Sequence, residues 1–190
     1  MTKTLLGARL RVLASGLVTM ALIARNLVAQ GGTITLLDYN ATVPSTWVSK
    51  TPSSTSRLAQ FIVPGKDSAE IVVYFFGASM GGNVDANLAR WRGQFTSGDT
   101  KPTSERVTRD STGKFPLTIA EYSGSYRRGV GAGSADSVRA GQTLIATIVE
   151  TPRGAMFIQL FGPNARVAAE RDTFLKFVKG IGGGGGGGGG

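Results

Sequence analysis

The sequence contains no cysteine and no histidine. Without cysteine the chain has no disulfide, no thiolate metal site and no thiol for lipid attachment. Without histidine it lacks the usual general base, the commonest zinc ligand and an imidazole that titrates near neutral pH. Carboxylates are the strong metal ligands that remain, and they do not recur at the spacing of a calcium loop. We therefore expect no metal, no cofactor and no enzymatic activity.

Acidic residues are absent from residues 1–30, which carry four basic ones. Three of these precede an apolar stretch over 12–24, and small residues follow near Ala29, a pattern typical of a signal peptide. As a helix this stretch would span about 20 Å, short of a bilayer core, but its extension past Arg25 nearly spans one. Residues 1–30 are thus either a signal peptide or an uncleaved membrane anchor. Both place the domain in the periplasm or at the outer face of the cytoplasmic membrane.

The net charge is moderately positive once residues 1–30 are set apart. The whole chain carries +9, and removing the four basic residues of this segment leaves +5. For an exported chain, such a charge favours an acidic protein partner or an anionic membrane surface over nucleic acid. The nine glycines of 182–190 cannot pack into a core, so we expect one domain over 31–181 and a polyglycine tail.

Hydrophobic periodicity and turn residues predict seven strands and two helices. The expected strands are 37–43, 57–63, 69–76, 105–109, 114–122, 142–151 and 155–161, with a long loop over 123–141. The first helix begins after Asn83 and buries Val84, Leu88, Trp91 and Phe95. The second starts at 163–164, buries Val167, Phe174, Leu175 and Val178, and exposes Glu170, Arg171, Asp172 and Lys176. Hairpin connections predict an α+β fold, a largely antiparallel sheet packed with helices in an αβα sandwich.

Several packing residues follow one another in an order that resembles the PsbP-like family. They are the run from Tyr39 through Pro44 to Trp47, Trp91 in the first helix, Phe157 in the late hairpin and Phe174 in the closing helix. The resemblance covers 37–181 and implies the sandwich that this family shares with the Ran-binding Mog protein. Family members include extrinsic lumenal subunits of photosystem II and uncharacterised exported bacterial proteins. The resemblance implies that the chain is an accessory subunit of a membrane complex, photosynthetic or electron-transferring. A shared fold alone does not assign a function.

A G-x-S-x-G motif over 77–81 lies between a predicted strand and a predicted helix, the context of a hydrolase nucleophile elbow. Ser79 would need a base to take its proton, and the chain has no imidazole. The motif is therefore more typical of a glycine-rich strand-to-helix turn. A serine hydrolase at Ser79 is the weakest of the three functions that we consider.

Basic and aromatic side chains mark a candidate partner-binding surface. It comprises Arg90, Arg92, Tyr126, Arg127 and Arg128. Arginine and tyrosine are enriched among the residues that anchor protein interfaces, whereas a basic face can equally serve solubility. The sequence thus favours a non-enzymatic binding or structural module with a membrane complex or acidic protein as partner. The alternative is a periplasmic carrier or sensor of a small ligand.

Overall fold

The computed structural model describes residues 31–79, 81, 83–95, 101–127 and 138–183. The predicted signal or anchor segment and most of the glycine tail lie outside these residues. Within the described part of the chain, no helix is long and apolar enough to cross a membrane.

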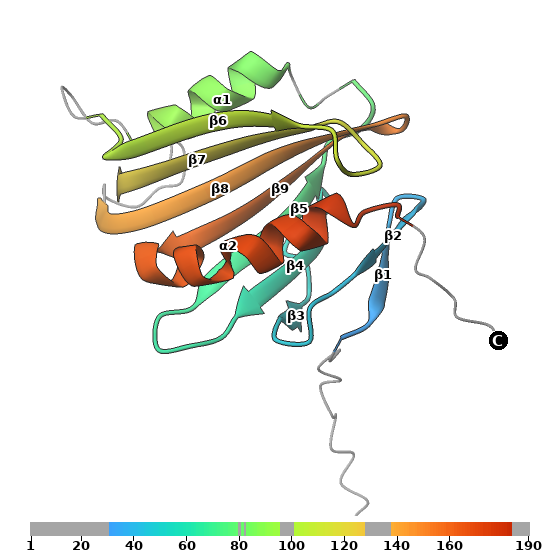
Figure 1. Cartoon of the computed structure of the whole chain (residues 1–190), viewed down its shortest axis with the longest axis horizontal. Coiled ribbons are helices and arrows are strands. Elements are labelled where there is room, and N and C mark those ends of the chain that lie inside the picture. The colour runs from blue at the N-terminus through green and yellow to red at the C-terminus, as the bar shows by residue number, and fades with distance from the viewer. Residues whose placement is uncertain (1–30, 80, 82, 96–100, 128–137, 184–190) are drawn as a thin grey trace, which may run out of the picture.

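A seven-stranded antiparallel sheet forms the centre of the molecule (Figure 1). Its strand order is β3-β4-β5-β9-β8-β7-β6, and a separate hairpin joins β1 to β2. The helices are α1 (Val84–Gly93) and α2 (Asn164–Lys179). The strands are β1 (Thr33–Leu36), β2 (Tyr39–Thr42), β3 (Val48–Lys50), β4 (Arg57–Val63), β5 (Ala69–Phe75), β6 (Ser104–Asp110), β7 (Leu117–Tyr126), β8 (Arg139–Thr151) and β9 (Gly154–Pro163).

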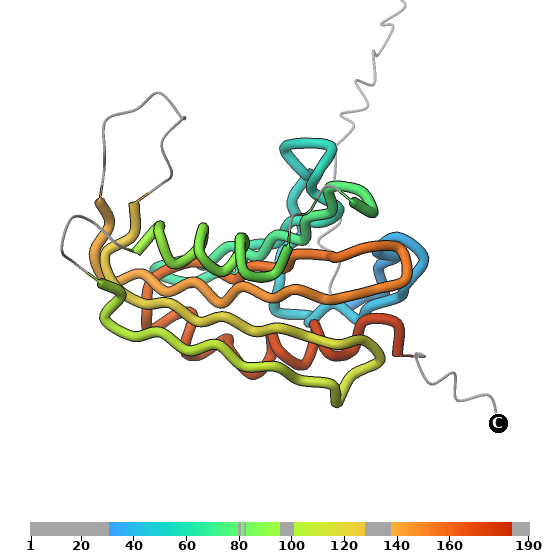
Figure 2. The backbone as a smooth tube through the Cα atoms, turned by 90° about the horizontal axis from the view of Figure 1, so that it is seen from above, coloured from blue at the N-terminus to red at the C-terminus, as the bar shows by residue number. Residues whose placement is uncertain are grey.

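The two helices cover opposite faces of the sheet, as the view along its edge shows (Figure 2). Side chains alternate between the faces along each strand, so that Ile145 of β8 packs on the α2 side and Leu144 on the α1 side. The larger core, under α2, includes Trp47, and the smaller, under α1, includes Trp91. The predicted α+β sandwich is therefore confirmed, with its sheet antiparallel throughout.

The start of the sheet domain differs from the single strand predicted over 37–43. The chain forms a hairpin there, because Leu37 adopts a positive φ of 55° and turns β1 back onto β2. Such a backbone is costly for a leucine, so the alternation of apolar residues alone did not reveal the turn. A short strand, β3, was also missed, since three residues carry too little periodicity.

The loop predicted over 123–141 is strand at both of its described ends, while 128–137 lie outside the described residues. β7 continues to Tyr126 and β8 starts at Arg139, and the two pair from Leu117 opposite Val149 to Tyr126 opposite Arg139. The ladder shifts register between Gly124 and Tyr126. Glycine at 124 has a φ of +145°, and this irregularity explains why the sequence there resembles a loop.

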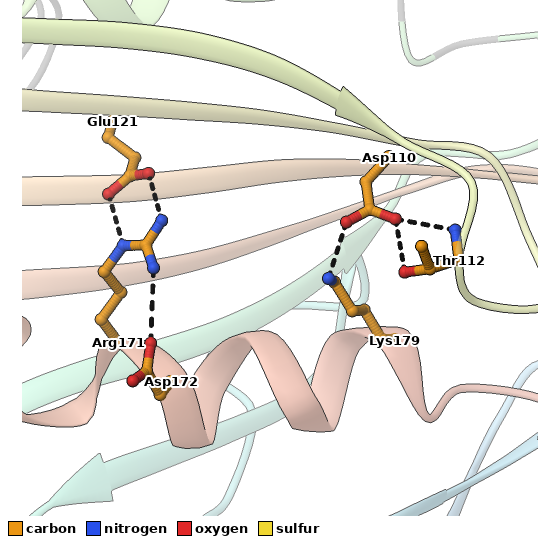
Figure 3. Close-up of polar contacts among 6 residues, drawn as sticks. All are labelled: Asp110, Thr112, Glu121, Arg171, Asp172 and Lys179. Carbon is orange, nitrogen blue, oxygen red and sulfur yellow. Dashed lines mark hydrogen bonds and ion pairs between the residues drawn. The ribbon is translucent and has the colours of Figure 1, made fainter.

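Polar side chains on α2 bind this helix to the sheet (Figure 3). Arg171 donates two hydrogen bonds to Glu121 of β7, with Nε–Oε2 and Nη2–Oε1 distances of 2.9 and 2.8 Å. Lys179 lies 2.6 Å from Asp110 of β6. The hydrogen bond from Arg171 lowers the pKa of Glu121, and those from Lys179 and Thr112 hold the pKa of Asp110 far below its usual value.

Glu170 was predicted to be exposed on α2, and this was wrong. Its side chain is buried and accepts a hydrogen bond of 2.7 Å from the indole Nε1 of Trp47. Trp47 is itself fully buried between Phe61 and Phe177. A buried carboxyl group needs a donor, and here the donor comes from a residue 123 positions earlier in the chain.

Candidate functional site

The two segments that carry the predicted partner-binding residues meet at the end of α1. Asn83 caps the start of this helix, its Oδ1 accepting a hydrogen bond of 2.7 Å from the backbone N–H of Ala86. Just after the helix ends, the backbone N–H of Arg127 donates to the carbonyl of Gln94 over 2.7 Å. This bond holds the end of β7 beside the last turn of α1, where Arg90 and Arg92 lie.

Arg90 is exposed, yet its position is constrained. Its Nη2 donates to Oδ1 of Asn87 over 2.7 Å. Asn87 is buried, and its Nδ2 donates to the carbonyls of Gly81 and Asn83 at 2.8 and 2.9 Å. The guanidinium of Arg90 is thus attached to the buried side of α1 while its charge faces solvent.

Arg92 ties α1 to the edge of the sheet. Its Nε lies 2.7 Å from Oε2 of Glu105 on β6, and the two side chains are 41% and 47% exposed. At this exposure the pair contributes little to stability, about 0–1 kcal/mol, and remains open to exchange with an outside partner. Beneath it, burial and the negative charge of Glu105 raise the pKa of Tyr122, whose hydroxyl donates to the carbonyl of Leu88.

Tyr126 forms the floor of this surface. Its ring centroid lies 4.4 Å from that of Phe161 and 5.5 Å from that of Phe95. The side chain is partly buried and belongs to the edge of the α1-side core. Arg127 is also partly buried. Arg128 lies outside the described residues.

Two residues of this surface were not predicted from the sequence. Glu105 partners Arg92, and Asn87 positions Arg90. Asn87 was recognisable in principle, because it lies one turn before Arg90 on the helix. The pairing of Glu105 depends on how β6 lies against α1, and no local pattern carries that information.

The 77–81 motif has a packing explanation. Gly77 adopts a φ of +97°, which turns the chain after β5. A Cβ on Gly81 would lie 2.6 Å from Cε2 of Phe157, and a Cβ on Gly154 would lie 2.8 Å from Cα of Ala78. Both glycines therefore allow close contact between this turn and β9. Ser79 is exposed in the turn.

Two hollows lie elsewhere on the molecule. One, of about 10 Å³, lies between β7 and the end of α2 and has room for roughly one water molecule. The other, of about 210 Å³, is an open groove beside Arg109, Thr118 and Glu150. It is smaller than the usual pocket for a small ligand, about 300–1,000 Å³. Within the described ranges, no group of three or more acidic side chains is arranged to hold a metal ion.

Comparison with known proteins leaves the family of this chain open. No family model matches it, and no curated protein matches it. Three similar solved structures have TM-scores below 0.5. A Bacteroides thetaiotaomicron protein has 12% identity and a TM-score of 0.45 over 80% of this chain, which spans only 48% of that protein.

The other two structures are matched over most of their length. A Pseudomonas aeruginosa protein of unknown function, described as a candidate regulator, has 13% identity and a TM-score of 0.40, with 79% of this chain and 94% of that one covered. A PsbP from the cyanobacterium Synechocystis has 11% identity and a TM-score of 0.46, with 81% and 92% covered. Similarity at this level carries no argument about function.

Proposed function

We propose that this chain is a non-enzymatic binding module that docks on an acidic surface of a protein partner. The docking surface is the α1–β7 basic surface, formed by Arg90, Arg92 and Arg127; the sequence adds Arg128, which lies outside the described residues. The observation that carries this proposal is the hydrogen bond from Arg127 N–H to the Gln94 carbonyl. It brings arginines from two distant segments to one end of the molecule.

The geometry of this surface suits docking better than catalysis. Arg90 is held at its base by Asn87, so little side-chain freedom remains to be lost when a carboxylate binds. Arg92 already forms an exposed ion pair, which a partner's carboxylate can extend or replace. Tyr126 and Phe161 supply a rigid aromatic base below the charges.

The location of the partner is inferred from the sequence. The basic and apolar pattern of residues 1–30 supports export, and with it a partner at the outer face of the cytoplasmic membrane. The resemblance to the PsbP-like family supports the role of accessory subunit in a membrane complex. Within that role, the α1–β7 basic surface would be the part that recognises the complex.

A pull-down from solubilised native membranes tests the proposal. The test variant is Arg90→Glu/Arg128→Glu, and the matched control is Lys50→Glu/Lys66→Glu, which makes the same charge change at the β3–β5 side of the sheet. We expect the test variant to lose the partner at low salt and the control to retain it. Raising the salt concentration should weaken capture by the wild type, because exposed charges are screened beyond about 8 Å at physiological ionic strength.

Equal recovery of the same partners by both variants at low salt would exclude this surface from the interface. Thermal melting of each purified variant must accompany the pull-down. Arg90 is exposed, but its replacement removes the donor to Oδ1 of the buried Asn87, so a modest fall in the melting temperature is expected and the pull-down is done well below it.

A further inference from the structure

β6 ends the sheet, and among the described residues no strand pairs with its outer side. All seven of its residues are exposed or partly exposed, and Val107 at its centre is 47% exposed. Every second residue of such a strand directs its backbone N–H and C=O away from the sheet, which makes the strand a template for another. The opposite edge strand, β3, has only three residues.

The sequence of β6 complements itself when it is reversed. If two copies pair antiparallel about Val107, Glu105 of each lies opposite Arg109 of the other, and Ser104 lies opposite Asp110. Arg106 then lies opposite Thr108, and the two Val107 side chains meet at the centre. No residue faces a like charge in this register. A shift that centres the pair on Arg106 would instead set two arginines directly opposite each other, which is destabilising.

We propose that β6 binds β6 of a second copy of this chain, antiparallel and centred on Val107. Glu105 lies on the α1 face of the sheet, where it pairs with Arg92. In the dimer it lies between Arg92 of its own chain and Arg109 of the second copy. This arrangement occurs twice by symmetry and extends each ion pair into a network of three charges.

The symmetry of this pairing has a geometric consequence. The two-fold axis passes through the Val107 pair and stands perpendicular to the sheet, so both α1 helices lie on the same face of one continuous sheet. The strand pair is small beside the roughly 1,600 Å² of a standard interface, and the dimer is therefore reversible and concentration-dependent.

The absence of cysteine provides a direct test in the full chain. Residues directly opposite in an antiparallel pair have Cα atoms about 4.5–5.5 Å apart, within the range that a disulfide needs. Val107→Cys should therefore give a disulfide-linked dimer under mild oxidation, seen on a non-reducing gel. Val138→Cys is the matched control, because Val138 is 45% exposed and lies outside β6. Cross-linking of Val107→Cys no faster than that of the control overturns the proposal.

Charge exchange tests the register in the same Val107→Cys background. With Arg109→Glu, Glu105 of each copy faces the acid introduced at position 109 of the other, so that two like-charged pairs form across the interface. Cross-linking should then slow on the order of tenfold. Adding Glu105→Arg restores opposite charges across the pair, and the rate should recover. Cross-linking that is insensitive to Arg109→Glu, or that does not recover in the double exchange, rules out this pairing. A circular dichroism melt of each variant confirms that Arg109, which is exposed, is not required for folding.

Discussion

The two faces of the sheet are built differently. Among the described residues, 22 buried hydrophobic side chains form the α2-side core and eight form the α1-side core. The α2 side also carries two interactions between charged side chains that join helix and sheet, Arg171 with Glu121 and Lys179 with Asp110. On the α1 side the ion pair between Arg92 and Glu105 is exposed.

The two tryptophans show the same difference between the two faces of the sheet. Both are buried, but Nε1 of Trp47 donates to Glu170, whereas Nε1 of Trp91 has no hydrogen-bond partner among the described residues. Charged side chains therefore join helix and sheet more firmly on the α2 side, whereas on the α1 side the links are the exposed Arg92–Glu105 pair and the hydrogen bond from Tyr122 to the Leu88 carbonyl. From this we infer that the α2 side provides most of the stability, which leaves the α1 side free to carry the partner surface that we propose.

The largest expected effect is that of Trp47→Ala. Removing a buried tryptophan costs about 3–5 kcal/mol, and leaving Glu170 without its donor adds about 1–3 kcal/mol. Urea unfolding should show the loss, provided that the variant still folds. Trp47→Phe keeps most of the ring and should isolate the cost of the missing N–H, whereas Trp91→Phe should lose no hydrogen bond. If Trp47→Phe and Trp91→Phe lower the free energy of unfolding equally, the hydrogen bond of Trp47 does not distinguish the two faces of the sheet.

Trp91→Ala is expected to destabilise the domain by about 3–5 kcal/mol, since it opens a cavity next to Phe157. This is less than the cost of Trp47→Ala. The urea midpoint measures it, and fluorescence of the remaining Trp47 reports whether the α2 side stays folded. If Trp91→Ala has the same urea midpoint as the wild type, the α1-side core does not contribute to global stability.

The next largest loss of stability is expected from breaking the pair of Arg171 and Glu121 on the α2 side, whose side chains are joined by two hydrogen bonds. Arg171→Met removes two charge-assisted hydrogen bonds to Glu121 and should cost about 1.5–3 kcal/mol. The matched change on the α1 side is Arg92→Met, with an expected cost of about 0–1 kcal/mol because its ion pair is exposed. Equal costs would remove this difference between the faces.

Acid should weaken the α2 side specifically. The folded protein lowers the pKa values of Glu121 and Asp110 below 4.5 and 3.8, so the unfolded chain binds these two protons more tightly. Their contribution is fully present above those unfolded values and is lost as the pH falls through the lower folded ones. Unfolding free energies measured from pH 6 to pH 2 should decline less steeply in Glu121→Gln. An identical decline in that variant would assign the acid sensitivity to other groups.

The smallest expected effect is that of a chelator. With neither thiols nor imidazoles in the chain, the melting temperature should not change in EDTA or in a reductant. A marked fall in EDTA would reveal a carboxylate metal site, and comparison of Trp47 and Trp91 fluorescence would show on which side it lies.

Local patterns predicted much of the sheet and both helices. Trp91 and Phe95 of the predicted helix stripe are buried as expected, whereas Val84 and Leu88 are only partly buried against the same core. The strands β4 and β5 and the hairpin of β8 and β9 lie close to their predicted bounds. What local patterns could not predict depends on contacts across the sequence. The turn at Leu37 contradicts the preference of its own residue type, and the burial of Glu170 depends on Trp47.

The candidate site, too, was predictable in its residue types but not in its arrangement. Arg90, Arg92 and Arg127 could be selected from the sequence as basic residues, but their meeting depends on the bond between the ends of α1 and β7. Tyr126 was selected as a contact residue, and the structure places its ring partly inside the core. Residue type therefore indicates which side chains are available for a surface, and only the topology decides which of them share it.

The position of β9 in the sheet has a consequence for how the chain is made. β9 is the last of the described strands, yet it lies between β5 and β8, and among the described residues it alone joins the two halves of the sheet. A growing polypeptide that has not yet reached residue 154 has two unconnected groups of strands and no α2. The sheet therefore cannot form as a whole until residues 154–163 have been added, and its completion depends on contacts between segments far apart in the sequence.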